Sequence, residues 1–373
     1  MKTKIIALLL AFIFIFSCGC SGGSEDTDKE QNESELLEPG EVNPVLFTAN
    51  GSEVTEEFFK YFVYYYKTEL ESVYGEIADW DAELQDGMTY WEYVKHMATE
   101  WFMYAGAVRA QIIRLGIEIT EEDKAIIQQY WNTFCETHGG EEAAIAELDT
   151  TYCSEAMYKY IVETNLLTEK CFEHMYGENG AKLSDEDCAD KTADQGYIMA
   201  KHILISTKTT DDAGNTVEMT ESEKAEAYKQ AKSIIVQLDQ CAPDKVEARF
   251  DEIMYSFTDD PGISSYPNGY LFQEGDMMEE FHNAAIGLEI GKYSGIVETS
   301  AGYHIILRIP VNYDVVPISY SSYIESGYDY YTLRYIVAEE MFQANIETWV
   351  DRVEVTYEDA YETVTLDKLL ARG

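Results

Sequence analysis

Apolar residues recur at helical spacing through the first half of the chain. Phe58, Phe62 and Leu70 lie three or four residues apart or at multiples of that spacing, which is typical of a helix with one buried face. Thr89 and Thr120 each have an acidic residue three positions later, a pattern of helix N-termini. A strand over 45–49 and a tight Asn50-Gly51 turn precede these helices. The pattern predicts helices over about 55–73, 89–115, 120–138, 141–148 and 154–176.

The periodicity changes near Gly196 and becomes helical again after Pro317. "YIMAKHILIS" predicts a strand, followed by amphipathic helices over 221–238 and 244–257. A long loop, a short helix over 278–286 and a hairpin over 291–310 come next, and the last elements are a helix over 328–350 and the strand "RVEVTYE". Because this final segment is too small for its own core, we expect Val353–Val355 to pair beside Val45–Phe47. The expected domains are 45–195 and 312–373, forming one helical body, and an inserted domain over 196–311.

The first 44 residues do not read as part of a fold. A basic start and an apolar run over 5–16 are followed by "FSCGCSGGS", which resembles a bacterial lipoprotein signal in 1–20. Either Cys18 or Cys20 would be the lipidated residue, and neither gives the usual Leu-x-x-Cys form. The alternative is an ordinary cleaved secretory signal. Residues 21–44 are acidic and polar, so we expect a disordered tether between a membrane anchor and the folded body.

The net charge and the cysteine spacing limit the kinds of partner and cofactor that we expect. The formal net charge of −44 argues against nucleic acid and anionic membrane surfaces. Its plainer reading is a well-solvated surface. The remaining cysteines, at 135, 153, 171, 188 and 241, show neither CxxC nor zinc spacing, so we expect no metal or other cofactor.

Two of the six histidines begin strands of similar composition. His202 stands in "AKHILIS" and His304 in "GYHIILRIP". A histidine in such a position usually only satisfies a hydrogen bond. Five pieces occur in order between 197 and 310: "AKHILI", "FDEIMYSFTDD", "NGYLF", "GDMMEEFHNAAIGLEIGKYSGIVET" and "AGYHIILR".

Together these pieces resemble a parvulin-type (PpiC) peptidyl-prolyl cis-trans isomerase, or rotamase. The flanks resemble the helical chaperone parts of exported foldases of the PrsA and SurA kind, through "VLFTANGSEVTEEFF", "GGEEAAIAEL" and "VEVTYE". The resemblance implies an α+β fold. A parvulin domain, built of a four-stranded antiparallel sheet and surrounding helices, is expected to be inserted in a mainly helical chaperone-like domain.

The resemblance also implies a site. His202 and His304 match two histidines that lie side by side beneath the proline pocket, and Asp260 matches a Cys or Asp beside the peptide carbonyl. Thr299 is expected to bond to one imidazole. The residues expected to bind the substrate proline and form the nearby wall are Leu271, Phe272, Met277 and Phe281.

Three departures put the strength of catalysis in question. Ala301 stands where the family often has Ser, so one hydrogen bond of the network is expected to be missing. "NGYLF" is shorter than the "GGDLG" loop of many members. The loop after the first strand, "TKTTDDAGNTVE", is not basic, so recognition of phosphoserine is not expected.

The chain is therefore interpreted as a membrane-anchored isomerase and foldase at the extracytoplasmic face of the cell membrane. Its partners would be unfolded or nascent exported polypeptides that contain X–Pro bonds; a homodimer stays open. The alternative is a non-catalytic holdase that uses the parvulin-like domain only to bind peptide. In that case aromatic residues of the helices would line a crevice, although ordinary core is the simpler reading for them: Tyr64–Tyr66, Trp91, Trp101 and Trp131.

Overall fold

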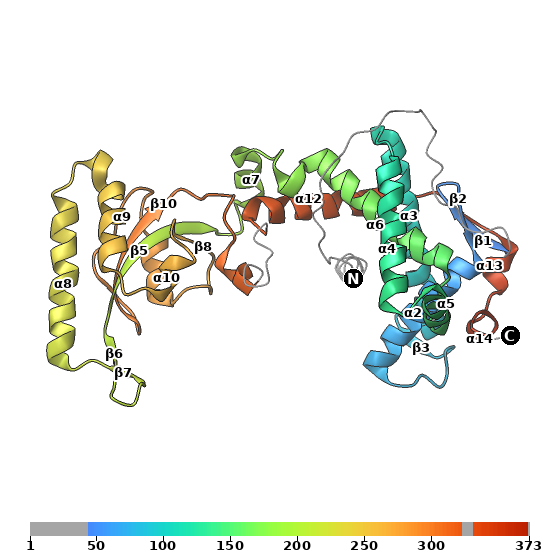
Figure 1. Ribbon diagram of the computed structural model, residues 1–373, viewed down its shortest axis with the longest axis horizontal. Helices are drawn as coiled ribbons and strands as arrows, with labels where there is room; N and C mark the ends of the chain where they lie inside the picture. The colour runs from blue at the N-terminus through green and yellow to red at the C-terminus, as the bar shows by residue number, and fades with distance from the viewer. Residues whose placement is uncertain (1–43, 323–330, 372–373) are drawn as a thin grey trace. The chain divides into compact units, whose positions relative to one another are not determined.

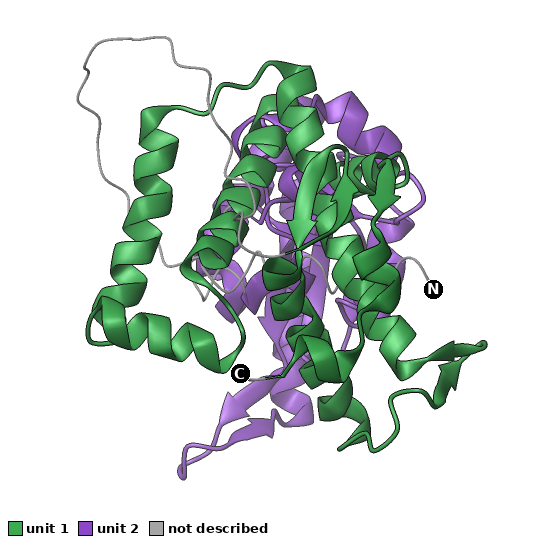
Figure 2. Ribbon diagram, turned by 90° about the vertical axis from the view of Figure 1, so that its right-hand side faces the viewer, with its two compact units in different colours: residues 1–175, 341–373 green, residues 176–340 purple. Residues whose placement is uncertain are grey.

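The computed structural model describes residues 44–322 and 331–371 and divides into two compact units (Figure 2). Unit 1 comprises residues 1–175 and 341–373, and unit 2 comprises residues 176–340. The expected boundaries at 195/196 and 311/312 both fall inside unit 2. The predicted signal peptide, the tether over 21–43, Cys18 and Cys20 lie outside the described residues, as does the predicted helix start at Tyr328.

A three-stranded antiparallel sheet joins the two ends of unit 1. Its order is β11 (Val355–Tyr357), β1 (Val45–Ala49), β2 (Ser52–Thr55), and Asn50-Gly51 forms the tight turn between β1 and β2 (Figure 1). The Asn50 side chain accepts the Glu354 N–H at 3.0 Å, which sets the register Ala49↔Val355 and Phe47↔Tyr357. The last strand does pair beside β1, but it begins at Val355 and not at Val353, and Val355 lies opposite Ala49.

The helices of unit 1 begin where the threonine pattern indicates. Thr89 and Thr120 form capping boxes with Glu92 and Asp123. Unit 1 also holds a short hairpin that was not predicted, β3 (Glu83–Gln85) with β4 (Met88–Thr89). The helices are α2 (Glu56–Tyr74), α3 (Tyr90–Leu115), α4 (Glu121–Thr137), α5 (Glu141–Thr150), α6 (Glu155–Tyr176), α13 (Asp359–Thr363) and α14 (Leu366–Leu369). Helix α12 (Leu333–Val350) begins in unit 2 and ends in unit 1.

Aromatic rings fill the core of unit 1. Phe62 stacks on Trp101 with ring centroids 3.9 Å apart, and Trp101, Trp131 and Tyr66 are buried. These three residues are part of the core, so the idea that they line a crevice for unfolded segments is wrong for them. The simpler reading, ordinary core, is confirmed for these three residues.

Unit 2 holds a four-stranded antiparallel sheet, and the expected α+β fold class is confirmed. The strand order is β8 (Tyr270–Phe272), β5 (Ile198–Ser206), β10 (Gly302–Ile309), β9 (Val297–Glu298). Helices α8 (Glu221–Asp239) and α9 (Val246–Phe257) pack on one face, where Lys201 of β5 binds Glu247 and Asp251 of α9. Helix α10 (Glu279–Ile286) packs on the other face. The smaller elements are η2 (Glu178–Gly180), β6 (Lys208–Thr210), β7 (Thr216–Glu218), η3 (Pro243–Lys245), η4 (Pro261–Ser264) and η5 (Ile318–Tyr320).

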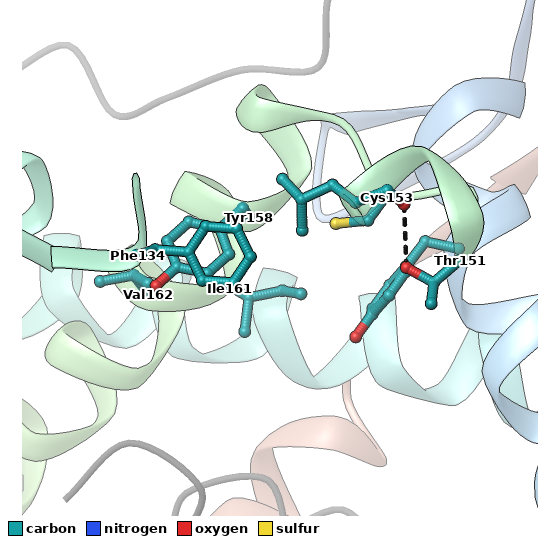
Figure 3. A pocket seen from close by; sticks show the side chains of 8 residues that line it. Phe134, Thr151, Cys153, Tyr158, Ile161 and Val162 are labelled. Carbon is teal, nitrogen blue, oxygen red and sulfur yellow. Dashed lines mark hydrogen bonds between the residues drawn. The ribbon is translucent and has the colours of Figure 1, made fainter. Parts of the chain in front are cut away.

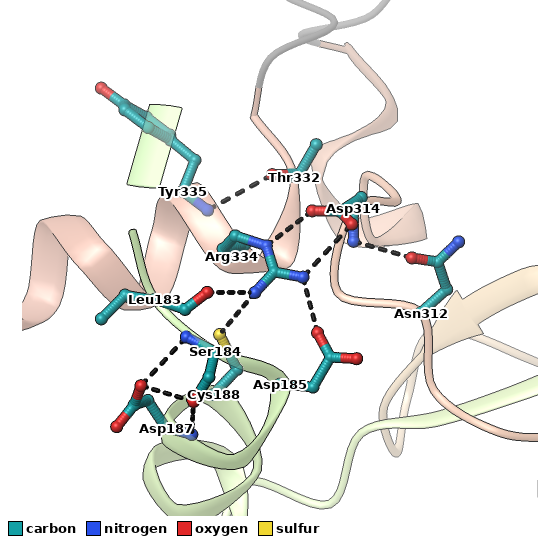
Figure 4. Close-up of polar contacts among 10 residues, drawn as sticks. All are labelled: Leu183, Ser184, Asp185, Asp187, Cys188, Asn312, Asp314, Thr332, Arg334 and Tyr335. Carbon is teal, nitrogen blue, oxygen red and sulfur yellow. Dashed lines mark hydrogen bonds and ion pairs between the residues drawn. The ribbon is translucent and has the colours of Figure 1, made fainter. Parts of the chain in front are cut away.

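A single arginine joins two other segments of unit 2 (Figure 4). Arg334, at the start of α12, bonds to Asp314 after β10, to the Leu183 carbonyl and to Asp185 of α7 (Asp185–Thr192). These contacts tie the start of α7 and the segment after β10 to the start of α12. In the described part of the chain no helix is long and apolar enough to cross a membrane, and the five cysteines are free thiols.

Candidate functional site

His202 and His304 meet on one face of the central strand pair of unit 2, and both lie inside their strands and not at the strand starts that the sequence pattern predicts. His202 on β5 lies opposite Ile306, and His304 on β10 lies opposite Leu204. This register makes the two imidazoles diagonal neighbours on the face that α10 covers. Their Nδ1 atoms are 3.0 Å apart and the rings stack at 24°. Both side chains are buried, with 7% and 2% of their surface exposed.

Asp260 meets the outer nitrogen of the first imidazole. Its Oδ2 lies 3.1 Å from His202 Nε2. The loop that carries it is fixed beside β5, because the Asp259 N–H donates to the Leu204 carbonyl at 2.8 Å. Burial alone would raise the pKa of Asp260, but hydrogen bonds from His202 and Tyr270 outweigh it and lower the pKa to about 2. The carboxyl group is therefore ionised at neutral pH and can only accept hydrogen bonds.

Thr299 completes the network at the other imidazole. Its Oγ1 lies 2.9 Å from His304 Nε2 and accepts the Ala301 N–H at 3.1 Å. This backbone contact would be present with a serine at position 301 as well, so it does not replace the bond of a serine hydroxyl.

The two ends of the network fix its direction. The Ala301 N–H can only donate and the Asp260 carboxylate can only accept. With one proton on each ring, the groups between them form a single donor-to-acceptor series: Thr299 O–H to His304 Nε2, His304 Nδ1–H to His202 Nδ1, and His202 Nε2–H to Asp260. Burial, together with the neighbouring His202, lowers the pKa of His304 to about 4 even though Asp260 opposes the shift. The His304 ring is thus neutral at pH 7.

An apolar cluster covers the imidazoles. The Phe281 ring of α10 stands edge-on to both, with centroids 5.2 Å from His202 and 5.4 Å from His304, and it also contacts Phe272. Phe281 is 2% exposed, whereas Met277 is only partly buried against the same cluster. The structure therefore places a partly exposed thioether and buried rings above a dry polar network.

Leu271 does not belong to this cluster, so its expected place in the wall of the pocket needs correction. In β8 the residues Tyr270 and Phe272 lie opposite Ala200 and Ile198 and share the face of the histidines. Leu271 is fully buried, but successive side chains of a strand point to opposite faces, which places it on the α8–α9 side.

Tyr270 is a site residue that the sequence reasoning missed. Its hydroxyl donates to Asp260 Oδ2 at 2.7 Å, and its ring lies 5.4 Å from that of His202. The signal was present in the "NGYLF" motif. Once Phe272 is placed on the histidine face, strand alternation puts Tyr270 there too, and a phenol next to a carboxylate and an imidazole is a natural donor.

A separate apolar pocket lies inside unit 1 (Figure 3). Its volume is about 180 Å³, and its walls are aromatic and aliphatic apart from the thiol of Cys153 and the hydroxyl groups. The lining residues are Tyr61, Phe134, Leu148, Thr151, Cys153, Tyr158, Ile161 and Val162. Across residues 44–322 and 331–371, no three His, Cys, Asp or Glu side chains gather as metal ligands would.

Comparison with known proteins identifies the class of the site. Residues 202–309 match the family model "Rotamase: PPIC-type PPIASE domain". The match runs from the first histidine of the network to the last residue of β10.

Relatives with this domain differ in how much of the chain they cover. A "Putative peptidyl-prolyl cis-trans isomerase" of Helicobacter pylori is 29% identical over 208 residues, 52% of this chain and 62% of the relative. The peptidyl-prolyl cis-trans isomerase ESS1 of Saccharomyces cerevisiae is 32% identical over 116 residues, 30% of this chain and 65% of the relative. The chain thus spans less than two thirds of the length of these relatives. The crystal structure of PrsA from Bacillus subtilis is 21% identical, with a TM-score of 0.25, and the match covers 71% of this chain and 86% of that one.

Proposed function

We propose that the chain is a peptidyl-prolyl cis-trans isomerase that assists the folding of exported polypeptides. The observation that supports this most strongly is the series from Thr299 through His304 and His202 to Asp260, covered by Phe281, within the domain that matches the rotamase model.

This arrangement suits a reaction that makes and breaks no covalent bond. An X–Pro bond rotates through a barrier of about 18–20 kcal/mol, because the planar amide is stabilised by resonance. Catalysis requires a site that binds the twisted amide better than either planar isomer. A dry apolar surface favours the less polar twisted state, and the buried network beneath it holds polar groups near the peptide without admitting water. A barrier lowered by about 5–6 kcal/mol would accelerate the rotation roughly 10⁴-fold.

A protease-coupled assay on a short Ala-Pro peptide tests the proposal with the full chain. We expect clear acceleration by the wild-type chain and a loss of about tenfold or more in Met277→Ala, whose partly exposed side chain is available to a proline ring. Ile290→Ala serves as a matched control, because Ile290 is 60% exposed and lies outside the apolar cluster. No acceleration by the wild-type chain would refute the proposal, and equal rates for wild type and Met277→Ala would remove Met277 from it.

We also propose that the protein acts from a lipid anchor at the extracytoplasmic face of the cell membrane. The apolar run over 5–16, the small residues with Cys18 and Cys20, and the acidic stretch behind them support this. Mass spectrometry of the N-terminal peptide from membrane-derived protein would test it. We expect an acylated cysteine as the first residue. One of the two variants Cys18→Ser and Cys20→Ser should lose this modification, and that variant identifies the lipidated cysteine. An unmodified N-terminus at a later residue would indicate an ordinary secretory signal instead.

One observation favours a second function, the binding of unfolded segments by unit 1. The pocket of about 180 Å³ is large enough for one apolar side chain. Val162→Trp would narrow it from one wall and should weaken suppression of aggregation of an unfolded test protein while leaving isomerase activity intact. Unchanged suppression by a folded Val162→Trp variant would refute a role for this pocket.

A further inference from the structure

We propose that Tyr270 is a positioning residue for the reaction: its hydroxyl holds the Asp260 carboxylate against His202 and thereby fixes the direction of the hydrogen-bonded series through both imidazoles. The inference rests on the proposed isomerase function and adds to it a residue outside the predicted set.

The contacts of the carboxylate show that it is held from three sides. Tyr270 donates to Oδ2 at 2.7 Å, the same oxygen that lies 3.1 Å from His202 Nε2. The other oxygen, Oδ1, accepts the Gly262 N–H at 3.0 Å. The Tyr270 side chain is buried, with 6% of its surface exposed. Among the residues that the structure describes, this hydroxyl is therefore the one side-chain donor, besides the imidazole, to the carboxylate oxygen that faces the network.

Gly262 leaves room for this hydroxyl. A Cβ atom built on Gly262 would lie 2.1 Å from the Tyr270 hydroxyl oxygen, much closer than atoms can approach without a shift. The same Cβ would lie 3.4 Å from Asp260 Oδ1, which is ordinary contact. A side chain at position 262 would thus displace the phenol and leave the carboxylate nearly undisturbed. The position of the Tyr270 hydroxyl therefore depends on the glycine at position 262.

The electrostatics of the surroundings are consistent with a fixed donor. The ionisable groups that face the pair are His202 from β5, His304 from β10 and Tyr266, whose ring lies 4.7 Å from that of Tyr270. Burial and the Asp260 carboxylate raise the pKa of Tyr270, so the phenol keeps its proton. Removing this donor would leave the carboxylate less stabilised, so the pKa of Asp260 would rise.

Tyr270→Phe removes only the hydroxyl and is the first test. We expect kcat/KM of the full chain to fall about tenfold and the acid limb of its pH profile to move to higher pH by about half a unit. The matched control is Tyr293→Phe. Tyr293 also donates to a carboxylate in unit 2, that of Asp239 at 2.6 Å, but it takes no part in the network. This control should retain wild-type kcat/KM and the wild-type pH profile.

A double-mutant cycle with Gly262→Ala separates a specific contact from general damage. In the wild-type background Gly262→Ala should cost about as much as Tyr270→Phe, because it displaces the same hydroxyl. In the Tyr270→Phe background it should cost little more. The inference would be overturned if the double variant lost kcat/KM by the product of the two single losses. It would also be overturned if Tyr270→Phe kept the wild-type kcat/KM and pH profile.

Failure of the proposed function gives a different result, because the wild-type chain itself would then be inactive. In that case the ¹⁵N chemical shifts of the imidazole rings decide the inference. Tyr270→Phe should change the ring ¹⁵N shifts of His202, whereas Tyr293→Phe should not. Identical imidazole spectra in wild type and Tyr270→Phe would overturn the positioning role independently of any activity.

Discussion

Acid should destabilise unit 2 through His304, and the size of the effect follows from its burial. The pKa of this imidazole is lowered from 6.5 to about 4 by burial and by the neighbouring His202. The unfolded chain binds the proton below about pH 6.5 and the folded chain only below about 4. The contribution to stability is therefore complete above pH 6.5 and is lost progressively as the pH falls toward 4. Between pH 7 and pH 5 the loss amounts to about 2 kcal/mol of unfolding free energy.

His304→Gln isolates this contribution from those of the many carboxylates. Glutamine keeps a donor and an acceptor next to His202 and Thr299 but does not titrate. Hydrogen exchange of peptides from β5 and β10 in increasing urea measures the unfolding free energy of unit 2 at each pH. All five tryptophans lie in unit 1, so their fluorescence reports that unit as an internal control.

The expected result is a pH dependence about 2 kcal/mol steeper between pH 7 and pH 5 in wild type than in His304→Gln, with unit 1 alike in both. Equal pH dependence in the two proteins would contradict the assignment of a neutral, buried imidazole at position 304.

Three further predictions concern stability and the geometry of the sheet. Arg109→Met should lower the unfolding free energy of unit 1 by about 3–5 kcal/mol, measured by urea unfolding with tryptophan fluorescence. The reason is that Arg109 forms a buried ion pair of 2.5 Å with Glu163, and both side chains are 3% exposed. Isomerase activity should persist under native conditions. Gly302→Ala should reduce both the stability of unit 2 and the isomerase rate, since φ is +147° there and a Cβ would lie 2.3 Å from the Ile205 carbonyl oxygen between β10 and β5. Arg334→Met should lower the stability of unit 2 by about 1–2 kcal/mol in hydrogen exchange, because its two carboxylate partners are exposed but its guanidinium is not. If a variant were as stable as wild type, the interaction or close packing proposed at that position would not contribute to stability.

Local signals in the sequence predicted the helix starts well, because a capping box depends only on residues three apart. Helix α7 was missed even though Ser184 and Asp187 form such a box, because its sequence is mostly polar and only Cys188 and Thr192 are buried. It is held by contacts of Leu183 and Asp185 with Arg334, 151 and 149 residues further along the chain, which no local pattern contains.

The site could be predicted as a set of residues but not as a geometry. The resemblance named both histidines, Asp260 and Thr299, which the structure brings together. It did not reveal which face each residue of β8 presents, so Leu271 was included and the phenol beside it was overlooked. The strand register with β5 decides this question, and the register depends on tertiary contacts.

The most direct test of the account is exchange NMR on an Ala-Pro peptide with catalytic amounts of the full chain. This measurement follows cis–trans interconversion at equilibrium and needs no coupling protease. The account predicts that wild type shortens an exchange that spontaneously takes tens of seconds or longer, and that replacing both histidines (His202→Ala with His304→Ala) largely abolishes the effect in a chain that still folds. An exchange rate in the presence of the wild-type chain equal to that of the peptide alone would contradict it.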